Sequence, residues 1–448
     1  MYIKSLFVAL ISISLSGCLE TDDDVTYGQC SAPDANNRLY DFLDDEYFWY
    51  GDLAQSFNPE KHSDIKEALA SLRVPQDRFS FAMTTAEYDD YQKSVFFGYG
   101  FSHSATENND GLKIRYVFEE GSAAQNGLRR GDTIVGVEGV DMATILSQVA
   151  AGTTTLNTVF GPNEAGHTID VEILKPDGSI IDTQFSKGSI TANTVMATQV
   201  KDVTIAGEAK KVGYLVFDSF DSRSEQELNV AFDEFADQNI DEMILDVRYN
   251  GGGLIRVAKQ LSTQIAGDEV ENEVFVKYVH NDKQSSRDQT SYFSLGAGFE
   301  KMNLDRVIVL TTGGSCSASE LVINALDPFV EVVIVGENTC GKPVGMYPEE
   351  ICDHVVFAIN FQTQNAVGFG DYFDGLSVDC PVNDVVTGDW GVDSDPLLAE
   401  GLYYLANDSC SASAVASPQN RNGGAKAKFI PSPPVDFSKG PIKAKNLL

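Results

Sequence analysis

The spacing of apolar residues predicts helices in the first part of the chain. Residues 65–72 place their apolar side chains on one face of a helix, and Pro75 follows as a stop signal. The aromatic run Tyr47 to Tyr50 has the same helical spacing, which is typical of a buried face. We therefore expect residues 31–94 to form a small N-terminal helical region.

The pattern changes near Val95. Gly98-Tyr99-Gly100-Phe101 predicts a glycine-aromatic turn before a strand, and residues 111–117 alternate apolar and polar positions as a strand does. From Thr191 onward, apolar runs of strand length alternate with amphipathic helical stretches, which indicates an α/β domain. The expected strands are 212–217, 242–247, 306–311 and 332–335, and the expected helices are 224–235, 254–265 and 317–326.

The N-terminus resembles a bacterial lipoprotein signal. Residues 1–17 contain Lys4 and then an apolar stretch too short to span a bilayer, and Leu15-Ser16-Gly17-Cys18 resembles a lipobox. An ordinary signal peptide with a chance cysteine is the alternative. The resemblance implies acylation of Cys18, a tether over 18–30, and a cell-envelope protein that faces the periplasm. Leu19 after the cysteine favours the outer membrane over the inner, by analogy with lipoprotein sorting in enteric bacteria.

Charge and cysteine content narrow the setting. The formal net charge of −34 argues against a nucleic-acid partner. Residues 411–448 hold six Lys/Arg against one acidic residue and are expected to be a flexible basic tail. Six cysteines besides Cys18, in an oxidising compartment, favour disulfides. Sequence proximity alone suggests the pairs Cys316–Cys340, Cys352–Cys380 and Cys30–Cys410. No Cys/His pattern suggests zinc, and no cofactor is expected.

Three segments of the last domain have the residue types of an acyl-transfer site. Residues 245–253 run from a hydrophobic strand into Gly251-Gly252-Gly253, so that backbone N–H groups at a helix start can face an anion. Residues 311–320 place three serines in a tight strand–helix turn, although serines there can simply cap the helix. Residues 335–345 place Lys342 in a loop, where it can act as a base only if burial lowers its pKa.

Together these segments resemble the carboxyl-terminal processing peptidases, serine peptidases with a Ser-Lys dyad. The matches are Ser317-Ala318-Ser319-Glu320 and the motif 336–342, Gly-Glu-Asn-Thr-Cys-Gly-Lys, whose lysine lies 25 positions after Ser317. The resemblance covers about residues 38–405. It implies Ser317 as nucleophile, Lys342 as general base, and Gly251, Gly252 and Ala318 as oxyanion donors. It also implies a ClpP/crotonase-like core over 188–410 in an α/β multidomain chain.

Residues 95–187 resemble a PDZ domain, inserted in or preceding that core. The likeness rests on the short helix after Gly121 and on Gly131-Asp132-Thr133-Ile134. It implies that Gly98, Tyr99, Gly100 and Phe101 bind the C-terminal carboxylate of a peptide that adds a strand to the sheet. A module that only packs against its neighbour is the alternative. The implied partners are proteins or peptides with free C-termini.

One position departs from the family pattern, and three other interpretations stay open. Many members have a glutamine four residues after the lysine, where this chain has Met346. A Ser-His-Asp mechanism would have to use one of the five histidines, His62, His103, His167, His280 and His354. His103 and His167 fall in the PDZ-like region, His62 falls in the helical one, and His354 lies near the core but in no familiar motif. A catalytically silent PDZ lipoprotein that scaffolds envelope proteins is the rival from another class. Another possibility is an enzyme that is activated when the PDZ domain binds a peptide.

Overall fold

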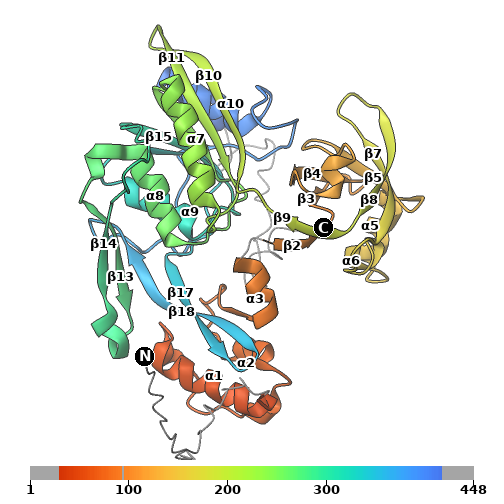
Figure 1. The fold of residues 1–448 in the computed structure, drawn as a ribbon, viewed down its shortest axis with the longest axis vertical. Helices are drawn as coiled ribbons and strands as arrows, with labels where there is room; N and C mark the ends of the chain where they lie inside the picture. The colour runs from red at the N-terminus through yellow and green to blue at the C-terminus, as the bar shows by residue number, and fades with distance from the viewer. Residues whose placement is uncertain (1–29, 93–94, 416–448) are drawn as a thin grey trace, which may run out of the picture.

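The computed structural model describes residues 30–92 and 95–415, and Figure 1 shows three parts: an N-terminal region, a central core and a β-rich domain. Cys18, the signal segment and residues 416–448 lie outside the described residues. None of the helices within the described ranges is long and apolar enough to cross a membrane.

The N-terminal region is largely helical, as the spacing predicts, but it also contains a strand. Its elements are α1 (Ala32–Glu46), η1 (Tyr50–Asp52), η2 (Pro59–Lys61), α2 (Ile65–Leu72), β1 (Phe81–Thr84) and α3 (Thr85–Gln92). The prediction that the aromatic run lies on a helix is wrong. Helix α1 ends at Glu46 because Tyr47 takes an extended conformation, and its buried ring packs into the core below the helix.

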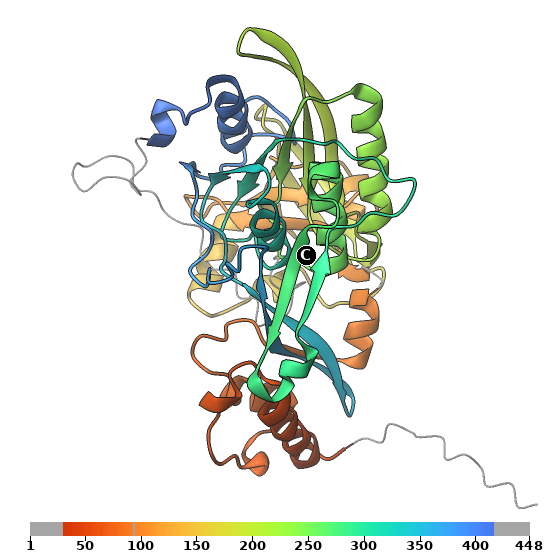
Figure 2. The same ribbon diagram turned by 90° about the vertical axis from the view of Figure 1, so that its left-hand side faces the viewer.

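A five-stranded antiparallel sheet joins this region to the core. It has the order β1-β18-β13-β14, with β17 also paired to β18. Its strands besides β1 are β13 (Val274–His280), β14 (Gln289–Tyr292), β17 (Val344–Ile351) and β18 (His354–Gln364), and η4 (Asp282–Arg287) lies between β13 and β14. Figure 2 shows β13 and β14 running from the core toward the N-terminal helices. A hydrophobic cluster that includes Leu39, Leu43 and Ile359 packs the N-terminal helices against this sheet.

The core is a six-stranded sheet in the order β10-β11-β12-β15-β16-β19, parallel from β11 onward. Its strands are β10 (Val195–Ile205), β11 (Glu208–Phe217), β12 (Glu242–Asp246), β15 (Arg306–Thr311), β16 (Glu331–Gly336) and β19 (Cys380–Pro381). Its helices are α7 (Ser224–Gln238), α8 (Ile255–Ala266), η3 (Gly267–Val270), α9 (Ala318–Leu326), α10 (Pro396–Asn407) and α11 (Ala412–Val415).

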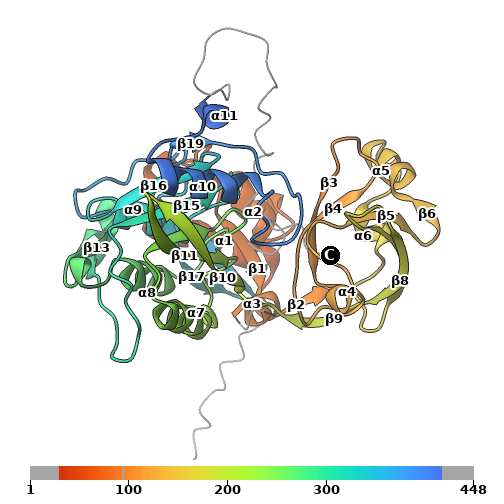
Figure 3. The same ribbon diagram turned by 90° about the horizontal axis from the view of Figure 1, so that it is seen from above.

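Alternation along the strands decides which helices cover each face. Leu215 and Phe217 of β11 pack with α7, α8 and α9, whereas Tyr214 and Val216 pack on the other face with α10 (Figure 3). The loops after β12, β15 and β16 carry Gly252, Ser317 and Lys342 respectively. Because these strands are parallel, their carboxyl ends bring the three loops to one edge of the sheet.

The β-rich domain lies beside the core and is joined to it through the two-stranded sheet of β2 (Val95–Gly98) and β9 (Gly188–Thr191) (Figure 3). Its main sheet has the order β3-β4-β5-β7-β8, with β6 paired to β5. The other bounds are β3 (Phe101–Ala105), β4 (Leu112–Val117), α4 (Ser122–Gln125), β5 (Thr133–Val137), β6 (Val140–Asp141), α5 (Met142–Ala150), α6 (Leu156–Val159), β7 (Thr168–Leu174) and β8 (Ile180–Ser186).

Residues 30–92 and 95–415 contain three disulfides, and one of the three predicted pairs is correct. Cys316 is bonded to Cys340 as predicted, but Cys30 pairs with Cys352 and Cys380 with Cys410. Closeness in sequence misled the assignment. The turn between β17 and β18 carries Cys352 to the start of α1, while Cys380 on β19 lies near the end of α10.

The start of the expected tail is also ordered. Helix α11 occupies Ala412–Val415, so the prediction of a flexible segment beginning at residue 411 is wrong for these positions. Ala414 is buried in the cluster that packs under α10, which fixes this turn to the core.

Candidate active site

Ser317 is held in a strained turn at the start of α9. Its backbone has φ 57° and ψ −109°, and the Ser319 N–H donates to the Cys316 carbonyl at 3.1 Å. These angles are those of the second residue of a type II′ turn, a position that favours glycine. A side chain there costs about 1–3 kcal/mol. Such strain is typical of a serine presented at a strand–helix junction.

Gly252 packs directly against this turn. It has φ +100°, and a Cβ added to it would lie 2.7 Å from Ser317 Cβ and 2.9 Å from the Ala318 nitrogen. Both the backbone angle and the lack of space require glycine at this position. The glycine-rich segment after β12 therefore lies against the serine turn, as the sequence predicts.

The three predicted oxyanion donors differ in what their amides do. The Gly252 N–H donates to Asn250 Oδ1 at 2.9 Å, so it is already engaged. Within the described residues, no hydrogen bond from the Gly251 or Ala318 amide to a protein acceptor is present. Ala318 is also the first residue of α9, where the helix dipole favours negative charge. The geometry thus favours Gly251 and Ala318 over Gly252 as donors.

Lys342 follows β16 and is partly buried beside an aromatic ring. Its ammonium lies 5.4 Å from the centroid of Phe79. Burial lowers the pKa of Lys342 to about 8, although the nearby carboxylates of Asp77 and Glu320 act in the opposite direction. A lysine with this pKa is largely neutral in mildly alkaline solution and can then accept a proton.

The buried carboxylate of Glu320 binds the serine turn and the lysine loop at once. Its Oε2 accepts the N–H groups of Ser317 and Lys342 at 2.9 Å each. Its Oε1 accepts the Thr339 hydroxyl at 2.5 Å and the Gly341 N–H at 2.8 Å. Burial raises the Glu320 pKa, and these four hydrogen bonds oppose that effect. The sequence pattern Ser-x-x-Glu at a helix start is a capping-box signal, which could have identified this role.

The Cys316–Cys340 disulfide makes a second connection between the same two loops. The Cα atoms are 5.2 Å apart, and the Cys340 N–H donates to the Ser315 carbonyl at 3.0 Å. Cys316 precedes Ser317, and Cys340 lies two residues before Lys342. The two predicted site residues therefore sit on loops that are fixed to each other.

No hydrogen bond joins the Ser317 hydroxyl to the Lys342 ammonium within the described part of the chain. Catalytic hydrogen bonds are often long before substrate binds, so this does not exclude a base–nucleophile pair. Met346, on β17, offers only a thioether at the position where the family pattern has glutamine. Three of the five histidines have other partners: His62 with Ser71, His280 with Asp288 and Tyr347, and His354 with Asp353.

A network of buried ion pairs holds the residues just before the three glycines in place. Arg248 is fully buried and pairs with Asp246 at 2.6 Å and with Asp395 at 2.9 Å. Arg130 of the β-rich domain reaches the same Asp395 at 3.4 Å and stacks 3.8 Å from the Trp390 ring centroid. These contacts connect the β-rich domain to the segment that begins Arg248-Tyr249-Asn250.

Of the predicted peptide-binding residues, Gly98 ends β2, Tyr99 and Gly100 form the turn that follows, and Phe101 begins β3. Tyr99 and Phe101 are buried in the β-rich core, and Gly100 has φ +94° against the backbone of Gly121. Strand β3 pairs only with β4, so its other edge has no partner strand in the described ranges. These residues belong to the β-rich domain, whereas Ser317 and Lys342 belong to the core.

In the part of the chain that the structure describes, two clusters bring sulfur and carboxylate atoms close enough to suggest a metal: Cys316-Glu320-Cys340 and Cys380-Glu400-Cys410. In both, the cysteines are joined as disulfides. A disulfide sulfur is not a thiolate, the form in which cysteine binds metal.

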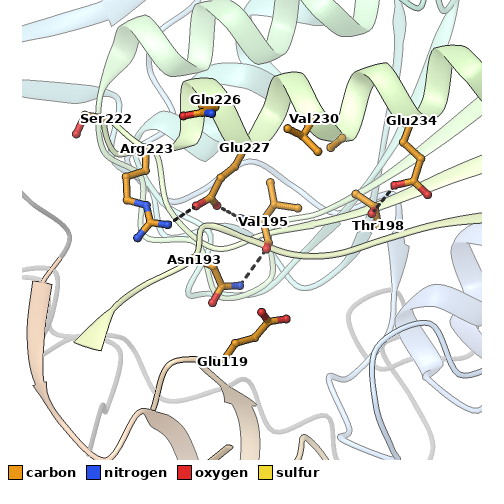
Figure 4. Close-up of a pocket in the computed structure, with 11 residues that line it drawn as sticks. Glu119, Asn193, Val195, Thr198, Ser222, Arg223, Gln226, Glu227, Val230 and Glu234 are labelled. Carbon is orange, nitrogen blue, oxygen red and sulfur yellow. Dashed lines mark hydrogen bonds and ion pairs between the residues drawn. The ribbon is translucent and has the colours of Figure 1, made fainter. Parts of the chain in front are cut away.

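A pocket of about 610 Å³ lies between α7, β10 and Glu119 of the β-rich domain (Figure 4). Its charged groups are largely engaged: Arg223 pairs with Glu227 at 3.2 Å, and Thr198 donates to Glu234 at 3.0 Å. Neither Ser317 nor Lys342 lines it. The pocket is therefore separate from the serine–lysine site.

Removing the Cys316–Cys340 disulfide is expected to reduce both stability and hydrolytic activity. With a sequence separation of 24, its loss should destabilise the fold by about 3 kcal/mol. We expect kcat to fall about tenfold in Cys316→Ala/Cys340→Ala, since a small misplacement of reacting groups is costly. Cys380→Ala/Cys410→Ala is the matched control, with a separation of 30 away from Ser317. Denaturant unfolding and peptide hydrolysis separate the effects, and equal kcat values in the two variants would contradict this role.

Comparison with known proteins gives a consistent result. Residues 211–366 match the profile of Peptidase family S41, and residues 34–81 match the Peptidase S41 N-terminal domain. The chain is 26% identical to a carboxyl-terminal-processing protease of Synechocystis sp. over 67% of this chain and 65% of that protein. It is 24% identical to the carboxy-terminal processing protease CtpA of Bacillus subtilis, over 76% of this chain and 68% of that protein.

The fold also has a solved counterpart. A crystal structure of a Bacteroides fragilis protein assigned to the S41 proteases has a TM-score of 0.70 and 22% identity. The match covers 83% of this chain and 97% of that one. The chain spans somewhat less than two thirds of the length of the cyanobacterial relatives, 65% and 63%.

Proposed function

The chain belongs to peptidase family S41, and from this membership and the geometry of the two joined loops we propose that it is a serine endopeptidase of the C-terminal processing type. The observation that carries the proposal is the Glu320 carboxylate, which binds the backbone of Ser317 and of Lys342 through one oxygen. A strained serine and a lysine of lowered pKa on loops fixed together suit acyl transfer.

The proposed reaction has two halves. Neutral Lys342 accepts the proton of the Ser317 hydroxyl while Oγ attacks the scissile carbonyl, and the amides of Gly251 and Ala318 stabilise the oxyanion. Lys342 then donates its proton to the leaving amine. Lys342 next takes a proton from water, which attacks the acyl carbonyl, and gives that proton to Ser317 Oγ as the bond to the second product breaks. No metal or cofactor takes part in this scheme, and the core is proposed to be ClpP/crotonase-like.

We propose further that residues 95–187 form a PDZ domain that selects substrates by their free C-termini. The amides of Tyr99 and Gly100 donate no hydrogen bond to a described acceptor outside the strands, and the open edge of β3 begins directly after them. Such a turn can bind a carboxylate while the peptide extends the sheet. The substrates would be exported proteins of the cell envelope.

Substrate selection is tested with one peptide in two forms. We expect the form with a free C-terminal carboxylate to be hydrolysed with a kcat/KM about tenfold higher than the amidated form, because only it offers a charge to the turn. Hydrolysis of both forms at equal rates would argue against selection through C-termini. Hydrolysis of neither form, with no difference between the wild type and Ser317→Ala, would favour the silent scaffold.

The lipid anchor and outer-membrane location remain part of the proposal. They rest on the lipobox-like residues that end at Cys18. Metabolic labelling with a fatty-acid analogue, compared with a Cys18→Ser variant, tests the modification directly. A wild-type protein without label would remove the anchor and leave the peptidase proposal unaffected.

A further inference from the structure

The N-terminal region forms part of the wall around Lys342. The turn between α2 and β1 carries Phe79, which is buried and faces the lysine ammonium at 5.4 Å. The preceding Arg78 donates to the carbonyls of Cys340 and Phe373 at 3.1 Å each. A segment more than two hundred residues away in sequence is therefore tied to the lysine loop.

Asp77 lies in the same turn and is held rigidly. Its Oδ1 accepts the N–H groups of Phe79 and Ser80 at 2.9 and 2.8 Å, and its Oδ2 accepts the Tyr47 hydroxyl at 2.7 Å. It is almost fully buried, and none of the described cations forms an ion pair with it within 4.0 Å. A buried carboxylate in this state interacts strongly with charges beyond direct contact, because the surrounding dielectric is low.

Resting on the proposed function, we infer that Asp77 is a positioning residue for Lys342. Its carboxylate attracts the ammonium toward the Phe79 side of the site, and the surrounding turn fixes the carboxylate itself. Met346 has no charged or hydrogen-bond-donating group that could position Lys342. The N-terminal region would then be a working component of the active site rather than only a structural attachment.

The test must separate the effect of Asp77 on Lys342 from those of the other titratable groups around the site. Glu320 on α9 also stabilises the protonated lysine, and its effect remains when Asp77 is changed. Arg78 reaches the lysine loop through Cys340 and carries the opposite charge. Tyr47 is linked to the site through its hydrogen bond to Asp77. Of these groups, Asp77 and Glu320 act on the Lys342 pKa in the same direction, both raising it.

The inference is tested by titrating Lys342 in proteins that lack the nucleophile. The pH dependence of acetic anhydride labelling at Lys342, read by peptide mass spectrometry, is measured in Ser317→Ala and in Ser317→Ala/Asp77→Asn. The asparagine keeps hydrogen-bonding groups for Phe79, Ser80 and Tyr47 but removes the charge. We expect the labelling midpoint, about 8 with Asp77 present, to fall by about one pH unit. In the active enzyme, the acid limb of kcat/KM should move by the same amount.

Two further variants keep the result unambiguous. Tyr47→Phe removes a hydrogen bond to Asp77 without removing its charge, so it should lower stability and leave the midpoint in place. Asp77→Ser is a second neutral variant whose hydroxyl can accept the same turn amides, and it should reproduce the shift if asparagine disturbs folding. An unchanged midpoint in both neutral variants would overturn the inference. If the midpoint shifts but the wild-type protein has no hydrolytic activity, the role of Asp77 is supported and the proposed function is refuted.

Discussion

Replacing Ser317 with alanine is expected to lower kcat/KM for peptide hydrolysis by roughly 10⁴-fold or more, because the alanine methyl group cannot form the acyl-enzyme. The fold should be retained. Alanine is smaller than serine, and the Ser317 backbone N–H still donates to Glu320. Hydrolysis of a casein or peptide substrate, together with circular dichroism, measures both quantities.

Ser319 is the matched control for this substitution. It lies in the same Ser-Ala-Ser-Glu segment and is buried, and its hydroxyl donates to the Asn250 carbonyl at 2.9 Å. Ser319→Ala should cost stability of about 1 kcal/mol and change kcat/KM by less than about tenfold. A larger loss of activity in Ser319→Ala than in Ser317→Ala would show that the nucleophile is misassigned.

Replacing Glu320 with glutamine is expected to produce the second large effect. The carboxylate accepts four hydrogen bonds, and a carboxamide can accept on one side only. Two buried donors would face its NH₂ group, which should destabilise the fold by about 3 kcal/mol. Since the serine turn and the lysine loop would lose their shared carboxylate and shift relative to each other, we expect kcat to fall about 100-fold.

Glu400→Gln separates loss of stability from loss of catalysis. Glu400 is also buried beside a disulfide, and it accepts the Ser411 N–H at 2.7 Å. This variant should unfold at a lower denaturant concentration but keep its kcat. If Glu320→Gln retained full kcat at a temperature where it is folded, Glu320 would have only a structural role.

The parts of the site that depend on a short stretch of sequence could be predicted from it. The strand bounds around residues 306–311, the helix that follows Ser317 and the glycine segment at 251–253 follow from apolar runs ending in small residues. The parallel order of the strands then brings their loops together. The confirmed Cys316–Cys340 pair depends on the same short-range geometry.

Features formed by distant segments could not be predicted from local patterns. Cys30 meets Cys352 across 322 residues, and nothing in either local sequence indicates the pairing. Asp77 is typical of a polar turn after Pro75, and long-range contacts, the pairing of β1 with β18 and the Arg78 hydrogen bonds, bring that turn to the lysine loop. The strand β1 itself forms because Phe81 stacks on Phe357, a tertiary contact that overrides the helical trend around it.

Acylation of Ser317 with help from Lys342 can be observed by mass spectrometry of enzyme quenched during turnover of an activated ester. We predict one acyl group per chain, located on the peptide that contains Ser317, absent in Ser317→Ala and strongly reduced in Lys342→Ala. Turnover with no adduct on Ser317, or with an adduct that persists unchanged in Ser317→Ala, would contradict the Ser317–Lys342 mechanism.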